Sequence, residues 1–215
     1  PQALACFYIR RGLRIWPIYF LVLALSAIVA PSFWPALPWH ATFLSNLYFM
    51  REGEWRPWPT AHLWSLSVEE QFYLIWPLLV LFAPRRTLPA IFIATIGIAI
   101  AYRATISLFW PQLDFPNIAT PAALDALGAG ALLAWLERRG HRIHPGTKTI
   151  VLAMITSALW ITLRFTQTLP YPWMFSLGEF LPVIPMAVLV AGSACGFSGW
   201  AGKLLNNRML RAIGK

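Results

Sequence analysis

The sequence predicts an all-α protein, a polytopic bundle of about six transmembrane helices. Hydrophobic residues make up 58% of the 215 residues and charged residues only 12%, and the mean hydropathy is +0.59. Soluble domains usually carry about 25% charged residues, so this composition excludes an ordinary soluble domain. The basic residues occur in short clusters between long apolar runs, which indicates membrane topology rather than a nucleic-acid-binding face.

Six apolar runs come close to the roughly 20 residues that cross a bilayer. They cover residues 13–30, 67–83, 88–110, 121–136, 149–165 and 177–197. Thirteen of the 17 Lys and Arg lie on one side of these spans, which the positive-inside rule makes cytoplasmic. Seven of the eight acids, all but Glu137, lie on the other side or just inside its membrane edge. We therefore expect a multi-pass protein of the inner (plasma) membrane with both chain ends cytoplasmic.

The first span follows a basic cluster, Arg10, Arg11 and Arg14. Basic residues at a helix start oppose the helix dipole, so they need another role. One role is positive-inside anchoring, and the other is binding a phosphate-rich cytoplasmic cofactor, because guanidinium groups fit phosphate oxygens. The apolar run is longer than a signal-peptide core. The chain starts at Pro1 and stops at Gly214-Lys215, so we expect it to be incomplete at both ends.

The segment between the first two spans is rich in proline and tryptophan, which predicts an irregular, stiff path. Two readings of its indole rings stay open. They form an aromatic belt at the outer headgroups, or they stack on sugar rings of an acceptor. The glycan-stacking candidates are Trp55, Trp58 and Trp64.

The second span begins with candidate catalytic groups. Ser67 and Glu70 have the spacing of a helix capping box, so Glu70 has a structural explanation, whereas Glu69 has none. A carboxylate here could accept a proton from a sugar hydroxyl, orient an imidazole or pair with an arginine. Tyr73 lies one turn below Glu69 on the same face, where it could share the hydrogen bonds of Glu69. His62, in the preceding loop, is either a surface residue or a fourth catalytic candidate.

The third and fourth spans each carry one charge inside an apolar run. Arg103 and Asp125 come to a similar depth on sequential antiparallel helices, which predicts an ion pair; the alternative is that Arg103 extends to the outer headgroups. Gly128 and Gly130 would allow close helix approach. Cys6 and Cys195 have no ligand or redox spacing, so no metal site is predicted.

Several segments resemble the acyltransferase family 3 membrane proteins, bacterial enzymes that O-acylate surface sugars. The most specific is residues 62–77, HLWSLSVEEQFYLIWP. Residues 7–19 are similar to the family's entry to its third helix, with an Arg-x-x-Arg at Arg11 and Arg14. Residues 125–134 and 210–215 resemble later family blocks. The likeness covers the middle six of about ten helices, so one transmembrane domain, residues 1–215, is predicted.

The resemblance implies an enzyme that takes an acyl group, usually acetyl, from acyl-CoA at the cytoplasmic face. It delivers that group to a hydroxyl of an outer glycan or glycolipid, such as a cell-envelope polysaccharide or lipopolysaccharide. The catalytic histidine of the family lies on an early helix, upstream of this segment, so no residue here takes that role. The alternatives are a transporter or permease, and a membrane segment without catalytic activity of its own.

Overall fold

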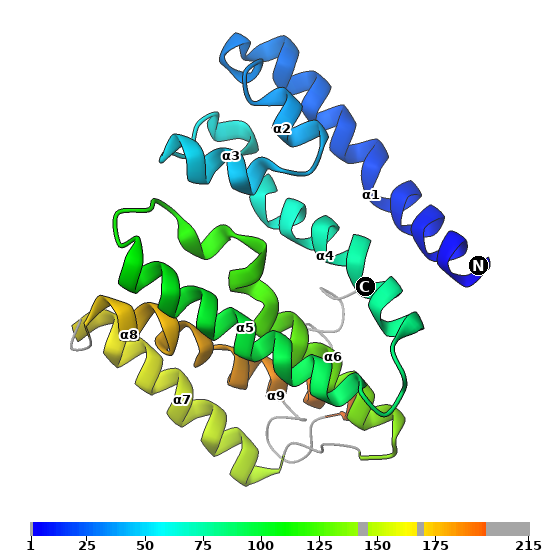
Figure 1. Ribbon diagram of the computed structural model, residues 1–215, viewed down its shortest axis with the longest axis vertical. Helices are drawn as coiled ribbons and strands as arrows, with labels where there is room; N and C mark the ends of the chain where they lie inside the picture. The colour runs from blue at the N-terminus through cyan, green and yellow to red at the C-terminus, as the bar shows by residue number, and fades with distance from the viewer. Residues whose placement is uncertain (1, 142–145, 167–169, 197–215) are drawn as a thin grey trace, which may run out of the picture. The chain divides into compact units, whose positions relative to one another are not determined.

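A computed structural model describes residues 2–141, 146–166 and 170–196, and within these residues every regular element is a helix. Figure 1 labels the α-helices, α1 to α9. In chain order the α-helices are α1 Gln2–Val29, α2 Leu37–Ala41, α3 Ser45–Glu52, α4 Leu63–Phe82, α5 Leu88–Phe109, α6 Leu124–Arg138, α7 Thr147–Thr166, α8 Tyr171–Ser176 and α9 Val183–Cys195. Short 3-10 turns lie between them: η1 Pro31–Phe33, η2 Trp58–Thr60, η3 Pro116–Ile118, η4 Thr120–Ala123 and η5 Gly178–Phe180.

Five segments within the described residues are long and apolar enough to cross a membrane, which confirms the polytopic all-α class. They are Leu4–Val29, Leu63–Phe82, Leu88–Phe109, Thr149–Thr166 and Pro172–Cys195. The fourth expected span, residues 121–136, differs. Its first residues form the turn η4, and α6 itself has 15 residues, about 22 Å of helix.

Two expected helix starts were wrong, and both helices begin earlier. Helix α1 starts at Gln2, so Arg10, Arg11 and Arg14 lie inside it rather than before it. Residues 2–11 contain no glycine or proline, so nothing in them interrupts a helix. Helix α4 starts at Leu63, three residues after the end of the proline-containing turn η2, so Ser67 is an interior residue.

Contacts divide the chain into two compact units. Unit 1 comprises residues 1–88 and 110–123, and therefore holds α1 to α4 with η3 and η4. Its apolar core joins the middle of α1 to the start of α4 through Tyr19, Leu23, Phe33, Ala36 and Leu63. Figure 1 shows α2 and α3 in the connection between these two long helices.

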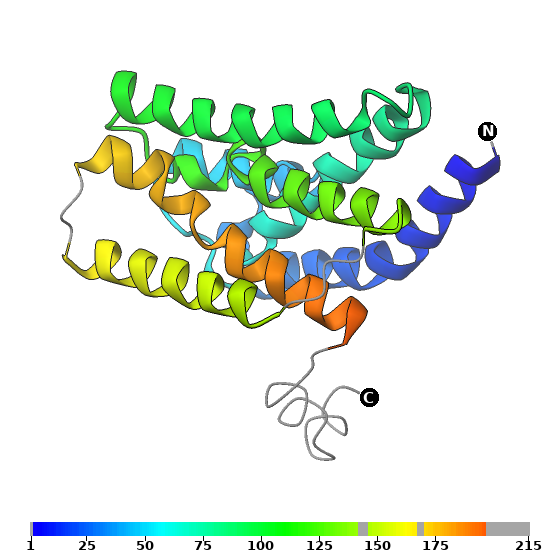
Figure 2. The same ribbon diagram turned by 90° about the horizontal axis from the view of Figure 1, so that it is seen from below.

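Unit 2 comprises residues 89–109 and 124–215, which include nearly all of α5 and the helices α6 to α9. Helix α9 packs against both α7 and α6. Figure 2 shows α7 (yellow) and α9 (orange) side by side. The single transmembrane domain over residues 1–215 stays a prediction.

Candidate functional site

One of the N-terminal arginines, Arg11, meets the carboxylates of the signature segment between α1 and α4. Arg11 Nε donates to Glu70 Oε1 at 2.8 Å, and its Nη2 lies 2.7 Å from the same oxygen. Tyr8 donates its hydroxyl to the Leu74 carbonyl at 2.9 Å. Residue 8 of α1 contacts residue 74 of α4, and residue 11 contacts residue 70, so the residue numbers increase along α1 while they decrease along α4. The two helices are therefore antiparallel, and residues 11 and 70 lie at the same level along the helix axes.

This pairing corrects the expected separation of an arginine cluster at one membrane face from carboxylates at the other. Arg11 lies about 10 Å along the candidate span from Leu4, and Glu70 lies about 10 Å along α4 from Leu63. Both charges therefore lie within candidate membrane spans. Charges at such depth are costly, and they occur where they are paired or serve a function.

Tyr73 completes this arrangement, in a role different from the one expected. The Arg11 guanidinium carbon lies 3.4 Å from the centre of the Tyr73 ring, a cation–π contact. The expected sharing of hydrogen bonds with Glu69 is replaced by this stacking. A planar guanidinium held by a carboxylate at its edge and a ring on its face has one preferred orientation.

The two glutamates differ sharply in environment. The Glu70 side chain is 11% exposed, whereas that of Glu69 is 54% exposed and its Oε2 is 3.8 Å from Arg11 Nη2. The predicted capping box is wrong, because α4 has no side-chain cap and no acid in its first turn. Ser67 instead shares a 2.7 Å hydrogen bond with Ser45. Glu69 is thus the accessible carboxylate and Glu70 the paired one.

His62 occupies the N-cap position of α4, with an exposed side chain. Its carbonyl accepts a 3.2 Å bond from the Ser65 hydroxyl. Within residues 2–141, no hydrogen bond or ion pair connects its ring with Glu69 or Glu70. The structure therefore does not join His62 to the carboxylates.

The three N-terminal arginines border one hollow of about 410 Å³ on α1. The described residues that line it are Cys6, Phe7, Arg10, Arg11 and Arg14. These positions recur every three or four residues and so share one face of the helix. Three guanidinium groups in one hollow suit an anionic ligand with several oxygens, because each presents forked N–H donors.

A polar network in unit 1 was missed by the sequence analysis. Gln71 donates to the Phe43 carbonyl at 2.7 Å and to Asn46 Oδ1 at 2.9 Å, and its Oε1 accepts from the Thr120 hydroxyl. Asn46 donates in turn to the Ile118 carbonyl at 3.2 Å. The network ties residues 116–123 to α3 and α4. Gln71, an amide inside an apolar run, was the one sequence feature that could have indicated this network. Asn46 and Thr120 belong to no recognisable sequence pattern.

A second missed residue is His40, whose side chain is fully buried in unit 1. Its Nδ1 donates a 2.9 Å hydrogen bond to the Ala36 carbonyl, and its backbone carbonyl accepts a 2.7 Å hydrogen bond from the Tyr19 hydroxyl. Burial lowers the pKa of His40, against the opposite effect of backbone groups at Ala36 and Thr60. This histidine is therefore held neutral in the core.

The three tryptophans proposed for sugar stacking divide into two groups. Trp55 lies 4.5 Å from the Phe115 ring centre and 6.4 Å from that of Trp64, so these two indoles pack within an aromatic cluster. Trp58 is 75% exposed. Trp58 is thus the best presented for stacking on a ligand.

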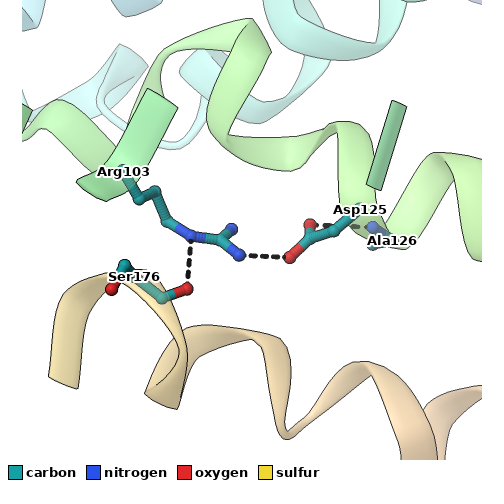
Figure 3. A network of polar contacts seen from close by, with 4 residues as sticks. All are labelled: Arg103, Asp125, Ala126 and Ser176. Carbon is teal, nitrogen blue, oxygen red and sulfur yellow. Dashed lines mark hydrogen bonds and ion pairs between the residues drawn. The ribbon is translucent and has the colours of Figure 1, made fainter. Parts of the chain in front are cut away.

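The predicted pair in unit 2 is confirmed. Arg103 Nη2 donates to Asp125 Oδ2 at 2.6 Å, and both side chains are almost fully buried. Figure 3 shows that Arg103 also donates to the Ser176 carbonyl, at 3.3 Å, and that Asp125 Oδ1 accepts from the Ala126 amide, at 2.8 Å. The alternative, an Arg103 that extends away toward the headgroups, is excluded by this burial.

Comparison with known proteins places this chain in a family. The family model described as "Acyltransferase domain" matches residues 1–215, the whole chain. The chain belongs to this acyltransferase family. That membership confirms the resemblance and the expected enzyme class, an O-acyltransferase, because several relatives are named as O-acetyltransferases.

Relatives are remote in sequence. An uncharacterised protein of Haemophilus influenzae is 27% identical over 207 residues, covering 86% of this chain and 84% of that protein. The peptidoglycan O-acetyltransferase OatA of Listeria monocytogenes is 26% identical, over 97% of this chain and 37% of its own length. A putative peptidoglycan O-acetyltransferase of Bacillus subtilis, YrhL, is 26% identical, over 82% and 29%. No solved structure matches the chain significantly.

The chain therefore spans only about a third of the O-acetyltransferases that it resembles. Within the described residues, the arginine hollow, the Arg11–Glu70 pair and the exposed Glu69 form the group of charges from which a site can be proposed. Within residues 2–141, 146–166 and 170–196, no three His, Cys, Asp or Glu side chains gather to hold a metal ion.

Proposed function

We propose that the full protein transfers an acyl group, usually acetyl, from acyl-CoA at the cytoplasmic face to a hydroxyl of a glycan or glycolipid outside. The observation that carries the proposal is the hollow on α1 bordered by Arg10, Arg11 and Arg14. Acyl-CoA carries several phosphate oxygens, and guanidinium groups bind phosphate through paired, charge-assisted hydrogen bonds. Membership of the acyltransferase family supports the reaction class.

On the acceptor side, we assign proton acceptance from the sugar hydroxyl to Glu69. Its carboxylate is half exposed and lies 3.8 Å from Arg11, whereas Glu70 is taken up by its 2.7 Å pair. A general base must be accessible to the proton that it removes. Trp58, with its exposed indole, is the proposed contact to the sugar ring. Peptidoglycan is the acceptor named for two relatives and is the first glycan to test.

The orientation of the chain in the membrane is part of the proposal. The basic residues of the 85–86 and 138–148 connections lie on the side that the positive-inside rule makes cytoplasmic. Single cysteines near Arg56 and near Arg139 test this with an impermeant thiol reagent in intact cells. The proposal expects labelling near Arg56 only, and the reverse pattern would contradict it.

The function itself is tested in membranes that contain the full-length protein, with acetyl-CoA labelled in its acetyl group. We expect label covalently attached to glycan hydroxyls, released by mild base. The variant Glu69→Gln should bind acetyl-CoA normally and lose most of the transfer, because an amide cannot accept the proton. No transfer from acetyl-CoA by the unaltered protein would overturn the proposal, and uptake of label without covalent attachment would favour a transporter.

A further inference from the structure

The three arginines that border the hollow differ in whether a carboxylate neutralises their charge. Arg11 is 18% exposed and already neutralised, because Glu70 lies 2.7 Å from it and the Tyr73 ring covers its face. Arg10 and Arg14 are exposed, and within the described part of the chain neither makes an ion pair or a side-chain hydrogen bond. The family resemblance had grouped Arg11 with Arg14, whereas the structure separates them.

Arg10 and Arg14 are four residues apart on α1, so they are neighbours on one helix face. Two like charges at this spacing repel each other and destabilise a helix slightly. An anion that bridges them relieves this repulsion, and a guanidinium fork can donate two hydrogen bonds to one phosphate. The 410 Å³ hollow lies within the size range of small-molecule sites.

Arg11 is poorly placed to act in the same way. To bind a donor phosphate, it would have to give up Glu70, leaving a carboxylate of 11% exposure without its cation. Uncompensated charge at such depth is costly. The contacts of Arg11 instead join α1 to α4 and fix the position of the helix turn that carries Glu69.

We propose that Arg10 and Arg14 bind the phosphates of the acyl donor, and that Arg11 is a positioning residue held by Glu70 and Tyr73. This assignment rests on the proposed function and narrows it. It adds Arg10 as a determinant of donor affinity and removes Arg11 from direct phosphate contact. The ligand class is a phosphorylated thioester donor whose phosphates bridge two guanidinium groups one helix turn apart.

The test uses the full-length protein in detergent and acetyl-CoA as the probe, with affinity measured at several salt concentrations. Arg10→Gln and Arg14→Gln should each weaken binding about tenfold or more and flatten its salt dependence, because each removes a charged hydrogen bond. The neutral double variant Arg11→Gln/Glu70→Gln should keep its affinity within about threefold. Arg85→Gln, which removes an exposed arginine outside the hollow, is the matched control and should change nothing.

A kinetic readout separates positioning from simple support of the fold. The double variant, normalised to folded protein, should lower kcat for acetyl transfer while leaving KM for acetyl-CoA unchanged, and Arg10→Gln should raise KM. A double variant that loses as much affinity as Arg14→Gln, with Arg10→Gln binding normally, would overturn the assignment. Absence of acetyl-CoA binding by the unaltered protein would instead overturn the proposed function, and this assignment with it.

Discussion

Among the arginine–carboxylate pairs of the described residues, the two least exposed, Arg103–Asp125 and Arg11–Glu70, differ in how completely they are enclosed. The side chains of Arg103 and Asp125 in unit 2 are 3% and 4% exposed, and each also forms a hydrogen bond with a backbone group. Those of Arg11 and Glu70 in unit 1 are 18% and 11% exposed and border an open hollow. We therefore infer that the first pair contributes to stability and that the second belongs to the proposed site.

We call Arg103–Asp125 the closed pair and Arg11–Glu70 the half-open pair. The difference between them follows from the groups that lie beside each pair. Around Arg103, the Ser176 carbonyl and the Ala126 amide complete the hydrogen bonding, so the pair has no need of an external partner. Beside Arg11 lie two exposed guanidinium groups and an exposed carboxylate, Glu69, which can act on a ligand. A closed pair contributes to the fold, whereas a half-open pair can position groups that react.

The largest effect is expected from breaking the closed pair. Asp125→Ala leaves Arg103 buried without its counter-charge, and we expect the free energy of unfolding to fall by about 3 to 5 kcal/mol. Denaturant unfolding of the protein in detergent micelles measures this. Asp114→Ala, at an exposed aspartate, is the control and should change stability by less than about 0.5 kcal/mol. Equal losses in both variants would show that the closed pair contributes nothing special.

A second prediction concerns the helix packing next to the closed pair. A Cβ atom at Gly128 would clash with the Thr95 hydroxyl and lie 2.8 Å from the Phe92 carbonyl, whereas one at Gly130 meets nothing within 4 Å. Gly128→Ala should cost about 1 to 3 kcal/mol in unfolding free energy, since it pushes α5 and α6 apart. Gly130→Ala should be neutral or slightly stabilising. A neutral Gly128→Ala would mean that close approach of these helices is unnecessary.

Breaking the half-open pair should have a smaller effect on stability. Glu70→Gln removes the charge from a hydrogen-bonded partner of Arg11, and we expect a loss of about 1 to 2 kcal/mol, less than for Asp125→Ala because the pair is partly solvated. The adjacent Glu69→Gln should stay within about 0.5 kcal/mol, since that side chain is 54% exposed. Thermal unfolding of both variants provides the comparison. A larger loss for Glu69→Gln would reverse the roles of the two glutamates.

The smallest expected effect is a pH dependence of the unfolding free energy, which arises from His40 in unit 1. Burial lowers the pKa of His40, so the folded protein binds fewer protons than the unfolded chain. The stability that His40 contributes is full above the unfolded pKa of about 6.5 and is lost as the pH falls toward its lowered pKa, by at most about 1.4 kcal/mol per pH unit. Unfolding of unit 1 should show this slope, and His40→Gln should flatten it. The exposed His62→Gln is the control, and an unchanged slope in His40→Gln would refute the assignment.

Sequence predicted the class and the closed pair because both depend on local, periodic signals. Apolar runs of about 20 residues predicted helical spans, and equal depth on sequential helices predicted Arg103–Asp125. These inferences need only chain order and helix rise. Gly128 also met its expectation of close approach, although Gly130 did not.

The half-open pair could not be predicted, because it depends on the register between α1 and α4, which are separated by a 33-residue connection that contains α2 and α3. Placing the start of α4 at Ser67 rather than Leu63 moved Glu70 into the first turn, where a cap explained it. Placing the start of α1 at Leu13 left Arg11 outside the bilayer. Both errors put the partners at opposite faces, and only the antiparallel packing seen in Tyr8 and Leu74 brings them together.

Acetyl transfer per folded molecule, measured for two matched neutral double variants of the full-length protein, tests the contrast between the pairs most directly. Arg11→Gln/Glu70→Gln should fold nearly as well as the unaltered protein and lose most of its transfer. Arg103→Gln/Asp125→Asn should yield much less folded protein, whose remaining molecules transfer acetyl at close to the normal rate. Normal transfer in the first variant together with loss of transfer in folded molecules of the second would contradict the division of roles between the two pairs.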